Sequence, residues 1–278
     1  MLDLMLITND PVMAAHAAAV GVGRIFVDLE ILGKVERQKH QDSVISRHTI
    51  EDLARIRASL PNHPILARLN PLHSGTDSEI ENVLAAGADF IMLPMFKTAE
   101  EAAIFITLVR GRARTILLLE TAQAMVRLDE ILKVDGIHEI YIGLNDLHLS
   151  LGLDFLFEPL ASGLVDSMVA RIRRKGISFG FGGIGKLDGT PLPGLRVLAE
   201  HVRLGSSSVI LSRSFHGGSQ TFEELQTKVD LGEEIRRLRA SEAELKARVM
   251  ASLEADALTT REIIWAIARE HRAKDILR

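Results

Sequence analysis

The chain has 278 residues, of which 47% are hydrophobic and 25% charged, so it can bury a large core and is too apolar to be disordered. A formal net charge of −4 gives no reason to expect nucleic acid or an anionic membrane as the main partner. The absence of cysteine excludes disulfides, thiolate metal sites and a cysteine nucleophile.

The first ten residues lack a basic region and their apolar run is short, which predicts that no signal peptide is present. No apolar stretch approaches the roughly 20 residues that span a bilayer. We therefore expect a cytoplasmic protein without a membrane partner.

Short apolar runs alternate with segments of helical period along most of the chain. The runs predict strands at residues 4–7, 24–28, 65–69, 90–93, 115–119, 139–142, 178–181 and 208–211. The segments between them predict helices at residues 11–20, 49–60, 78–86, 99–109, 122–134, 157–175 and 192–204. Eight strands that alternate with helices favour a (β/α)8 TIM barrel over an open sheet.

The C-terminal part of the chain differs from the rest. Residues 220–256 are strongly charged with a leucine-rich stripe, which predicts a long amphipathic helix whose stripe is interrupted near Ser241 and Glu242. Residues 260–276 predict a last helix that carries the only tryptophan, Trp265. We expect a barrel domain over residues 1–219 and a helical extension over residues 220–278. An apolar face outside a complete barrel favours packing on a neighbour, so a homo-oligomer is predicted.

Two acidic residues follow buried runs: Glu120 comes after residues 115–119, and Asp146 closes the run that begins at residue 139. A carboxylate at the end of a buried strand is costly unless something pairs with it, and two such strand ends could share a divalent cation. The lack of a histidine at either end favours Mg²⁺ or Mn²⁺ over Zn²⁺. The alternative is that the two residues cap the helices that follow them.

Catalytic groups of barrel enzymes lie at the C-terminal ends of the strands. The other polar residues predicted at that end are Asp28, Glu30, Arg68, Asn70, Asn145, Ser212 and Arg213. Arg68 could bind the carboxylate or the developing enolate oxygen of a 2-oxo acid. It could also form an ion pair with Asp28 or Glu30, and both could hold at once.

Residues 180–185 satisfy the G-x-G-x-x-G pattern of dinucleotide-binding proteins, but a turn-rich segment follows where that fingerprint needs a helix. This favours a glycine-lined strand end, including Gly183, that lets a substrate approach the backbone.

Several further residues could contact a ligand at this end of the barrel. Ser206, Ser207, Ser212 and Arg213 could add a phosphate or carboxylate contact, as barrels often do near the last strand. His40, His48 and His148 could reach the site, although surface or capping positions are more common for such residues.

Residues 118–131, 136–147 and 151–152 resemble the metal-dependent 2-keto-3-deoxy acid aldolases and the citrate lyase beta subunit-like proteins, with further matches at residues 27–30, 67–70 and 87–95. The resemblance spans about residues 4–215. It implies a phosphoenolpyruvate/pyruvate-type barrel in which Glu120 and Asp146 hold Mg²⁺ or another divalent cation. It also implies that Arg68 contacts a pyruvoyl group, that an enolate takes part in carbon–carbon cleavage, and that C-terminal helices exchange between subunits.

Two positions depart from this resemblance. The aldolase branch carries a histidine that assists proton transfer directly after Asp-x-Glu, where this chain has Ile31, and an acidic residue before Gly87, where it has Ala85 and Ala86. Glu30, Lys34, Glu36 or a metal-bound water could replace the proton-transfer group, or the chemistry differs. The citrate lyase-like branch shares Asp-Leu-Glu, but its second acid is also replaced by Ile31.

The sequence thus predicts a Mg²⁺- or Mn²⁺-dependent carbon–carbon lyase that acts on a small-molecule 2-oxo acid through a pyruvate enolate. The predicted residues are the metal ligands Glu120 and Asp146, the catalytic residues Arg68, Glu30 and Asp28, and the substrate-binding residues Arg68, Asn70, Gly143, Asn145 and Gly183. The alternatives are an acyl-CoA lyase of the citrate lyase beta subunit type and a barrel without aldolase chemistry that acts as a binding or assembly module.

Overall fold

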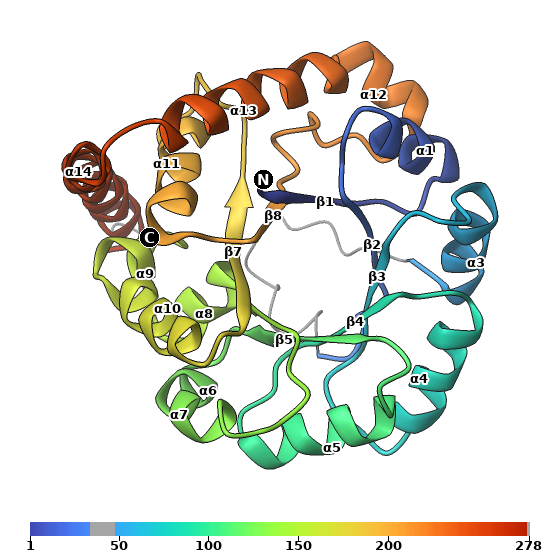
Figure 1. Cartoon of the computed structure of the whole chain (residues 1–278). Coiled ribbons are helices and arrows are strands. Elements are labelled where there is room, and N and C mark those ends of the chain that lie inside the picture. Colours follow the sequence, from blue (N-terminus) through green and yellow to red (C-terminus); the bar gives the residue numbers. More distant parts are fainter. Residues whose placement is uncertain (34–47, 277–278) are drawn as a thin grey trace.

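The structure is a computed structural model that describes residues 1–33 and 48–276. Its centre is a closed barrel of eight parallel strands in chain order (Figure 1). The strands are β1 (Asp3–Ile7), β2 (Arg24–Asp28), β3 (Ile65–Arg68), β4 (Phe90–Leu93), β5 (Arg114–Leu119), β6 (Glu139–Ile142), β7 (Ser178–Ile184) and β8 (Ser208–Leu211). Pairing of β8 with β1 closes the barrel and confirms the predicted TIM barrel.

Helices surround the barrel on its outer side (Figure 1). They are α1 (Pro11–Ala19), α3 (Ile50–Ser59), α4 (Thr76–Ala85), α5 (Ala99–Val109), α6 (Ala122–Val126), α7 (Leu128–Ile131), α8 (Leu144–Ser150), α9 (Glu158–Ala161), α10 (Leu164–Arg174) and α11 (Gly194–Leu204). Capping boxes begin α3 at Thr49 and α5 at Thr98, where Asp52 and Glu101 stand three residues further on.

Two predicted helices are each divided in the structure. The helix predicted over residues 122–134 is split into α6 and α7 at Arg127, and the helix predicted over residues 157–175 is split into α9 and α10 at Gly163. The φ angle of Gly163 is +80°, a left-handed conformation that ends a helix. The helix α8 was not predicted and begins directly after β6.

Apolar side chains fill the inside of the barrel. The interior cluster consists of Met5, Phe26, Leu66, Met92, Ile116, Leu118 and Tyr141. All seven are nearly inaccessible to solvent. The barrel is therefore a packed core with room for a ligand at one end of its axis and not a pore.

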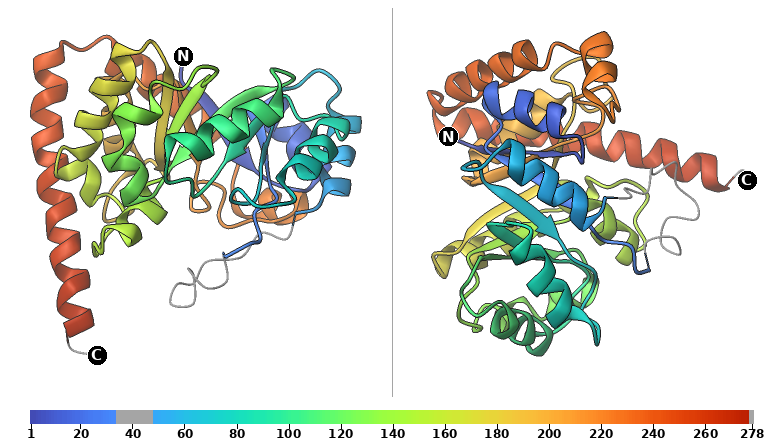
Figure 2. Two further views of the ribbon diagram at one scale, coloured as in Figure 1. Left: turned by 90° about the horizontal axis from the view of Figure 1, so that it is seen from below. Right: turned by 90° about the vertical axis from the view of Figure 1, so that its right-hand side faces the viewer.

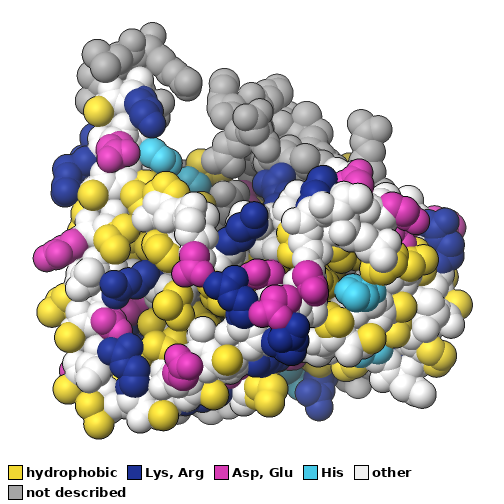
Figure 3. Space-filling view, turned by 90° about the horizontal axis from the view of Figure 1, so that it is seen from above, with side chains coloured by type: hydrophobic (Ala, Val, Ile, Leu, Met, Phe, Trp, Pro, Cys, Tyr) yellow, Lys and Arg dark blue, Asp and Glu magenta, His cyan; other side chains and the backbone are white. Residues whose placement is uncertain are grey.

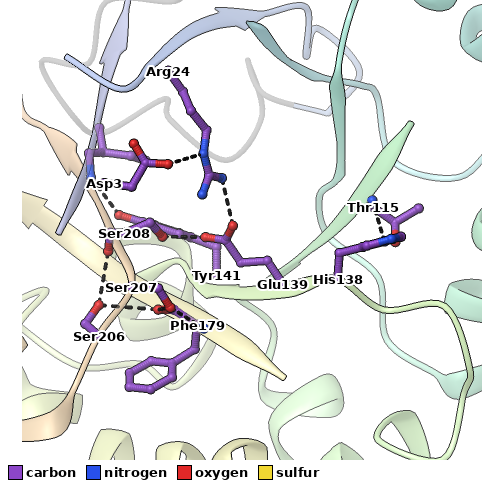
Figure 4. Close-up of polar contacts among 11 residues, drawn as sticks. Asp3, Arg24, Thr115, His138, Glu139, Tyr141, Phe179, Ser206, Ser207 and Ser208 are labelled. Atoms are coloured by element: carbon purple, nitrogen blue, oxygen red, sulfur yellow. Dashed lines mark hydrogen bonds and ion pairs between the residues drawn. The ribbon is translucent and has the colours of Figure 1, made fainter. Parts of the chain in front are cut away.

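A polar cluster closes the N-terminal end of the barrel (Figure 4). The guanidinium of Arg24 lies 2.5 Å from Asp3 Oδ2 and 2.7 Å from Glu139 Oε2, and Ser208 donates a hydrogen bond to Glu139. Arg24 also lies over the ring of Phe90, 4.4 Å from its centroid. Each of these five residues is the first residue of its strand. The cluster therefore lies at the end of the barrel opposite the predicted active site.

The C-terminal extension forms α12 (Phe222–Lys228), α13 (Leu231–Lys246) and α14 (Met250–Ile276). The prediction of one helix over residues 220–256 is therefore wrong, because the chain leaves the helical conformation at residues 229–230 and 247–249. The last helix begins at Met250 and not at residue 260. The predicted division of the chain into two domains stays a prediction.

The stripe of α13 contains a buried polar residue and no break. Glu242 is buried within the helix, where its Oε1 accepts a hydrogen bond from the backbone N–H of Leu2 at 2.6 Å, and Arg239 and Lys246 pair with it. Glu242 thus binds the N-terminal segment of the chain through Leu2. Its place among the buried leucines explains the apparent interruption of the apolar stripe.

The helix α14 runs along one side of the barrel, packed on α11 and α9, and its C-terminal part extends past the barrel (Figure 2). Acidic, basic and apolar side chains intermingle on the face of the molecule that Figure 3 presents. Within the described ranges, none of the helices combines the length and the apolar composition that a membrane span requires.

Candidate active site

A cavity of about 210 Å³ lies at the C-terminal end of the barrel. Its floor is apolar and comes from the barrel interior, while its charged groups come from residues that follow or end the strands. The lining residues are Ile7, Phe26, Arg68, Met92, Leu118, Glu120, Tyr141, Gly143, Leu144, Asn145, Asp146, Leu156, Gly182, Gly183 and Ile210. A small, mostly apolar pocket with a few convergent charges is typical of a site for a small polar ligand.

Glu120 follows β5 directly and is buried at the cavity. Its Oε1 accepts a hydrogen bond of 3.1 Å from the backbone N–H of Met95, a residue with a φ of +55°. The helix α6 is capped by Thr121, which accepts from the N–H of Ala124, so the alternative that Glu120 caps this helix is wrong. In the described part of the chain, Oε2 of Glu120 has no hydrogen-bond partner and remains available to a ligand.

Asp146 lies in the first turn of α8 and not at a strand end, because β6 already stops at Ile142. Gly143 stands at the N-cap of α8, and no side chain caps that end of the helix among the described residues. Asp146 nevertheless lines the same cavity as Glu120. The helix N-terminus favours a negative charge at this position.

Burial raises the pKa of Glu120 well above its ordinary value, and the neighbouring carboxylate of Asp146 raises it further, although Arg68 opposes the shift. A cation between the two carboxylates would reverse this effect, since it favours their charged forms. Two carboxylates with open positions suit Mg²⁺ or Mn²⁺, which keep waters or take substrate oxygens. Residues 1–33 and 48–276 contain no group of three or more acidic or histidine side chains that could hold a metal. A cation at this cavity would therefore have to complete its coordination with water or substrate oxygens.

Arg68 ends β3 beside Asp28, its register partner on β2. Its Nε and Nη2 each donate to one oxygen of Asp28 at 2.8 Å, and Nη2 also lies 3.4 Å from Glu30 Oε2. The alternative of an ion pair to these carboxylates is therefore confirmed. Burial lowers the pKa of Arg68, but the two carboxylates outweigh this effect and the pKa is raised. Its Nη1 has no protein partner in the ranges that the structure describes, and the side chain lines the cavity.

The structure brings most of the predicted site residues to the cavity. Those that line it are Arg68, Glu120, Gly143, Asn145, Asp146 and Gly183. Asp28 and Glu30 do not line it and contact Arg68 instead. Their predicted catalytic role stays a prediction, and their contact with Arg68 indicates that they orient its guanidinium.

Asn70 lies away from the cavity lining. Its Oδ1 accepts hydrogen bonds from the N–H groups of Ile31 and Leu32 at 2.8 and 2.9 Å, and its Nδ2 donates to Glu79 at 2.7 Å. The side chain thus holds the segment that follows β2. Its role in substrate binding stays a prediction. Ile31, at the position of the family histidine, is 57% exposed.

Of the three histidines that could reach the site, His48 and His148 lie in the described part of the chain. His48 accepts a hydrogen bond of 3.1 Å at Nδ1 from the N–H of Asp28. A surface or capping position was the commoner expectation for His148, but the residue is buried, with Nδ1 3.3 Å from the carbonyl oxygen of Leu144. His40, Lys34 and Glu36 lie outside the described residues.

The serines before β8 lie at the wrong end of the barrel for the predicted contact. Ser207 donates from its backbone N–H to Phe179 at 2.8 Å, and Ser206 and Ser207 precede β8 at its N-terminal end (Figure 4). The prediction that these two residues contact a ligand is wrong, because both precede β8 and so lie at the end of the barrel opposite the cavity. Ser212 follows β8 at the cavity end and shares a hydrogen bond with Ser214.

Sequence reasoning missed the aromatic floor of the site. The hydroxyl of Tyr141 donates to the carbonyl of Gly182 at 2.6 Å and accepts from the N–H of Ile210 at 2.9 Å, which holds the irregular pairing of β7 with β8. Its ring fits because residue 180 is glycine, where a Cβ would lie 2.5 Å from Tyr141. Alternation along β6 could have identified Tyr141 as an inward-facing residue.

Comparisons with known proteins find a family model and solved structures that are similar to this chain. A family model described as HpcH/HpaI aldolase/citrate lyase matches residues 3–155. A 2-keto-3-deoxy-L-rhamnonate aldolase of Escherichia coli O1:K1 / APEC is 28% identical over 168 residues, which cover 48% of this chain and 61% of the relative. The protein of the same name from Klebsiella pneumoniae subsp. pneumoniae is 28% identical over 165 residues, with the same coverage. The chain thus spans 61% of the length of these curated relatives.

Solved structures share the fold. An HpcH/HpaI aldolase from Desulfitobacterium hafniense DCB-2 superposes with a TM-score of 0.59 at 15% identity and covers 76% of this chain and 86% of the other. An HpcH/HpaI aldolase/citrate lyase family protein from Burkholderia cenocepacia J2315 gives a TM-score of 0.60 at 14% identity and covers 88% and 94%. At these identities the likeness establishes the shared barrel architecture.

Proposed function

Because the chain belongs to the HpcH/HpaI aldolase/citrate lyase family, we propose that it is a divalent-metal-dependent lyase that cleaves or forms a carbon–carbon bond of a 2-oxo acid through a pyruvate enolate. The observation that carries this proposal is that Glu120, Asp146 and Arg68 line one small cavity. Two carboxylates for a cation and one guanidinium for an anion match the charges of such a substrate.

Each group has a definite part in this proposal. A Mg²⁺ or Mn²⁺ ion held by Glu120 and Asp146 would polarise the oxo group and favour charge on the enolate oxygen. Arg68 binds the substrate carboxylate through Nη1, while Asp28 and Glu30 hold the rest of its guanidinium in place. The apolar floor excludes water and strengthens these charge interactions.

The test is metal-dependent enolisation. In D2O with Mg²⁺ or Mn²⁺, the protein is expected to exchange the methyl protons of pyruvate, followed by NMR, and to release pyruvate from 4-hydroxy-2-oxo acids. 2-Keto-3-deoxy-L-rhamnonate is the first substrate to try. Both activities should be lost in Glu120→Ala and retained in Glu130→Ala, which changes an exposed carboxylate of α7. Turnover that persists after chelation would refute the metal role.

An acyl-CoA lyase is the second candidate, since the matching family model also covers citrate lyase. Such an enzyme needs a groove for coenzyme A outside the cavity of about 210 Å³, and its turnover would depend on a thioester. A binding or assembly module is the third candidate, because Ile31 replaces the expected proton-transfer histidine. Metal binding without any exchange of pyruvate protons would favour this third reading.

The C-terminal helices are proposed to join copies of the chain. Leu258 and Trp265 on α14 are 62% and 36% exposed, although the opposite face of this helix is buried on the barrel. An apolar face of this kind is a candidate contact between subunits. Light scattering after size-exclusion chromatography should show an oligomer that Leu258→Glu weakens, whereas a monomeric wild-type chain would contradict this part of the proposal.

A further inference from the structure

Leu156, in the loop between α8 and α9, is one of the residues that line the cavity, and this loop is contacted by a helix outside the barrel. Leu144 and Gly182 also line the cavity. The loop is fixed at its end by Glu158, whose Oε1 accepts hydrogen bonds from the N–H groups of Asp154 and Phe155 at 2.7 and 2.8 Å. A change in this loop would therefore move the wall of the cavity.

The end of α14 contacts the same loop. Arg272 Nε lies 2.7 Å and Nη2 2.6 Å from Asp154 Oδ2. His271 Nδ1 lies 3.3 Å from the carbonyl oxygen of Asp154, and its ring meets that of Phe155 edge to face, with centroids 5.5 Å apart. We call these contacts of His271 and Arg272 with Asp154 and Phe155 the α14 clasp.

The clasp continues the packed side of α14. The buried residues of this helix recur every three or four positions, at Leu253, Ala257, Thr260, Ile264 and Ala268. His271 and Arg272 come three and four residues after Ala268, so they stand on the same side one turn further on. The packing of α14 on the barrel therefore places His271 and Arg272 next to the loop that contains Asp154 and Phe155.

The strand order places Leu156 where the far end of a substrate would lie. In a closed barrel of eight strands, β3 and β7 stand opposite each other. Arg68 ends β3, whereas Gly182 and Gly183 on β7 line the opposite side of the cavity. The loop of Leu156 reaches this side, because the ring of the next residue, Phe157, lies 3.8 Å from the position that a Cβ at Gly182 would take. A 2-oxo acid that bound its carboxylate to Arg68 would direct its distal group toward β7 and the loop of Leu156.

We propose that Leu156, positioned by the α14 clasp, determines the size of the distal group that the cavity accepts. This inference rests on the proposed function, since it takes the cavity as the site of the 2-oxo acid. The side chains of Leu144 and Leu156, which both line the cavity, are apolar. They would therefore select by size and not by hydrogen bonding, and such discrimination is modest. Arg272 and Asp154 act as positioning residues through the loop and do not touch the ligand.

The first measurement compares two probes by titration calorimetry with the Mg²⁺-loaded full chain. The probes are pyruvate and the branched 4-methyl-2-oxopentanoate. Leu156→Ala should improve the affinity for the branched acid relative to pyruvate by about tenfold or more, as expected for the space of several methylene groups. Arg272→Ala should shift the same ratio by roughly two- to fivefold, since its ion pair is exposed. Arg269→Ala, an exposed arginine one turn earlier on α14, is the matched control and should leave the ratio unchanged.

The second measurement reports on the clasp without any ligand. Hydrogen exchange of the peptide that contains residues 152–157 should be faster in Arg272→Ala and Asp154→Ala, unchanged in Arg269→Ala, and no faster in the double variant than in either single one. Unchanged exchange would overturn the clasp. Faster exchange with an unchanged affinity ratio in all variants would overturn the role of Leu156. If the wild-type protein binds neither pyruvate nor 4-methyl-2-oxopentanoate, both the proposed function and the selective role of Leu156 are refuted. The hydrogen-exchange rates would still show whether the α14 clasp holds the loop.

Discussion

Asp28 and Arg68 are register partners on β2 and β3, and both oxygens of Asp28 accept hydrogen bonds of 2.8 Å from the guanidinium. This forked pair fixes the plane of the guanidinium at the edge of the cavity that also holds Glu120. The pairing of two strands thus orients the cation of the site, and the cation can offer its remaining nitrogen to an anionic ligand.

Arg68→Lys should weaken pyruvate binding by about tenfold or more and lower the free energy of unfolding by about 1–3 kcal/mol, because an ammonium cannot reproduce the fork to Asp28. Calorimetric titration and urea unfolding measure the two effects. The matched control is Arg112→Lys, which changes a similar fork to Glu81 on the surface. It should change the stability by less than about 1 kcal/mol and leave the affinity unaltered. Equal effects of the two variants on pyruvate binding would contradict the role of Arg68.

The stability of the metal-free protein should depend on the protonation of Glu120. Burial and the Asp146 carboxylate raise the pKa of Glu120, so above the ordinary pKa of a glutamate the folded state keeps a proton that the unfolded chain has released. Because the folded state binds more protons, the free energy of unfolding falls as the pH rises from that ordinary value toward the raised one. In Glu120→Gln this fall should disappear, which urea unfolding in EDTA at a series of pH values can measure.

The same experiment with Mg²⁺ provides the complementary result. A cation binds the ionised carboxylates, so added Mg²⁺ should stabilise the wild-type protein more at higher pH and should stabilise Glu120→Gln much less. Glu130→Gln, on the surface, should behave as the wild type does in both series. An equal response to Mg²⁺ in the wild type and in Glu120→Gln would rule out Glu120 as a ligand.

Gly143→Ala should displace the Glu120 carboxylate. A Cβ at residue 143 would lie 2.8 Å from Glu120 Oε2 and 2.9 Å from its Cβ, and the backbone itself is compatible with alanine because its φ is −80°. We expect a loss of Mn²⁺ affinity of about tenfold or more, comparable to the loss of a group that orients a metal ligand. Mn²⁺ binding can be followed by electron paramagnetic resonance. Gly232→Ala on α13, where a Cβ meets nothing closer than 3.4 Å, should retain the affinity.

Arg24→Met should separate stability from function. Arg24 pairs with Asp3 and Glu139 at the closed end of the barrel. Its removal leaves the buried carboxylate of Glu139 without a cation and should lower the free energy of unfolding by about 3–5 kcal/mol. Because the cavity lies at the other end, the affinity for pyruvate should stay within about twofold of the wild type at a temperature where the variant is folded. A loss of affinity as large as in Arg68→Lys would show that the two ends are coupled.

Much of the barrel could be read from local patterns. The alternation of apolar runs and helical segments reflects which residues each element buries, so all eight strands were predicted close to their observed bounds. The capping boxes at Thr49 and Thr98 involve residues three apart and need no distant partner. The sequence also placed Glu120 and Arg68 at one face of the barrel, since parallel strands bring their C-terminal ends together. Asp146 lines the same cavity, but from the first turn of α8 and not from the predicted strand end.

Other features depend on partners that are far apart in the chain. Glu242 is tied to Leu2, 240 residues away, so its place in the stripe of α13 could not be interpreted from its neighbours. Arg272 meets Asp154 across 118 residues. The fork between Asp28 and Arg68, and the position of Ser206 and Ser207 at the closed end, follow from strand register. The periodicity of apolar residues in the sequence indicates which side chains are buried. It does not indicate their partners, because each contact depends on how two helices or strands pack together, and these elements are far apart in the chain.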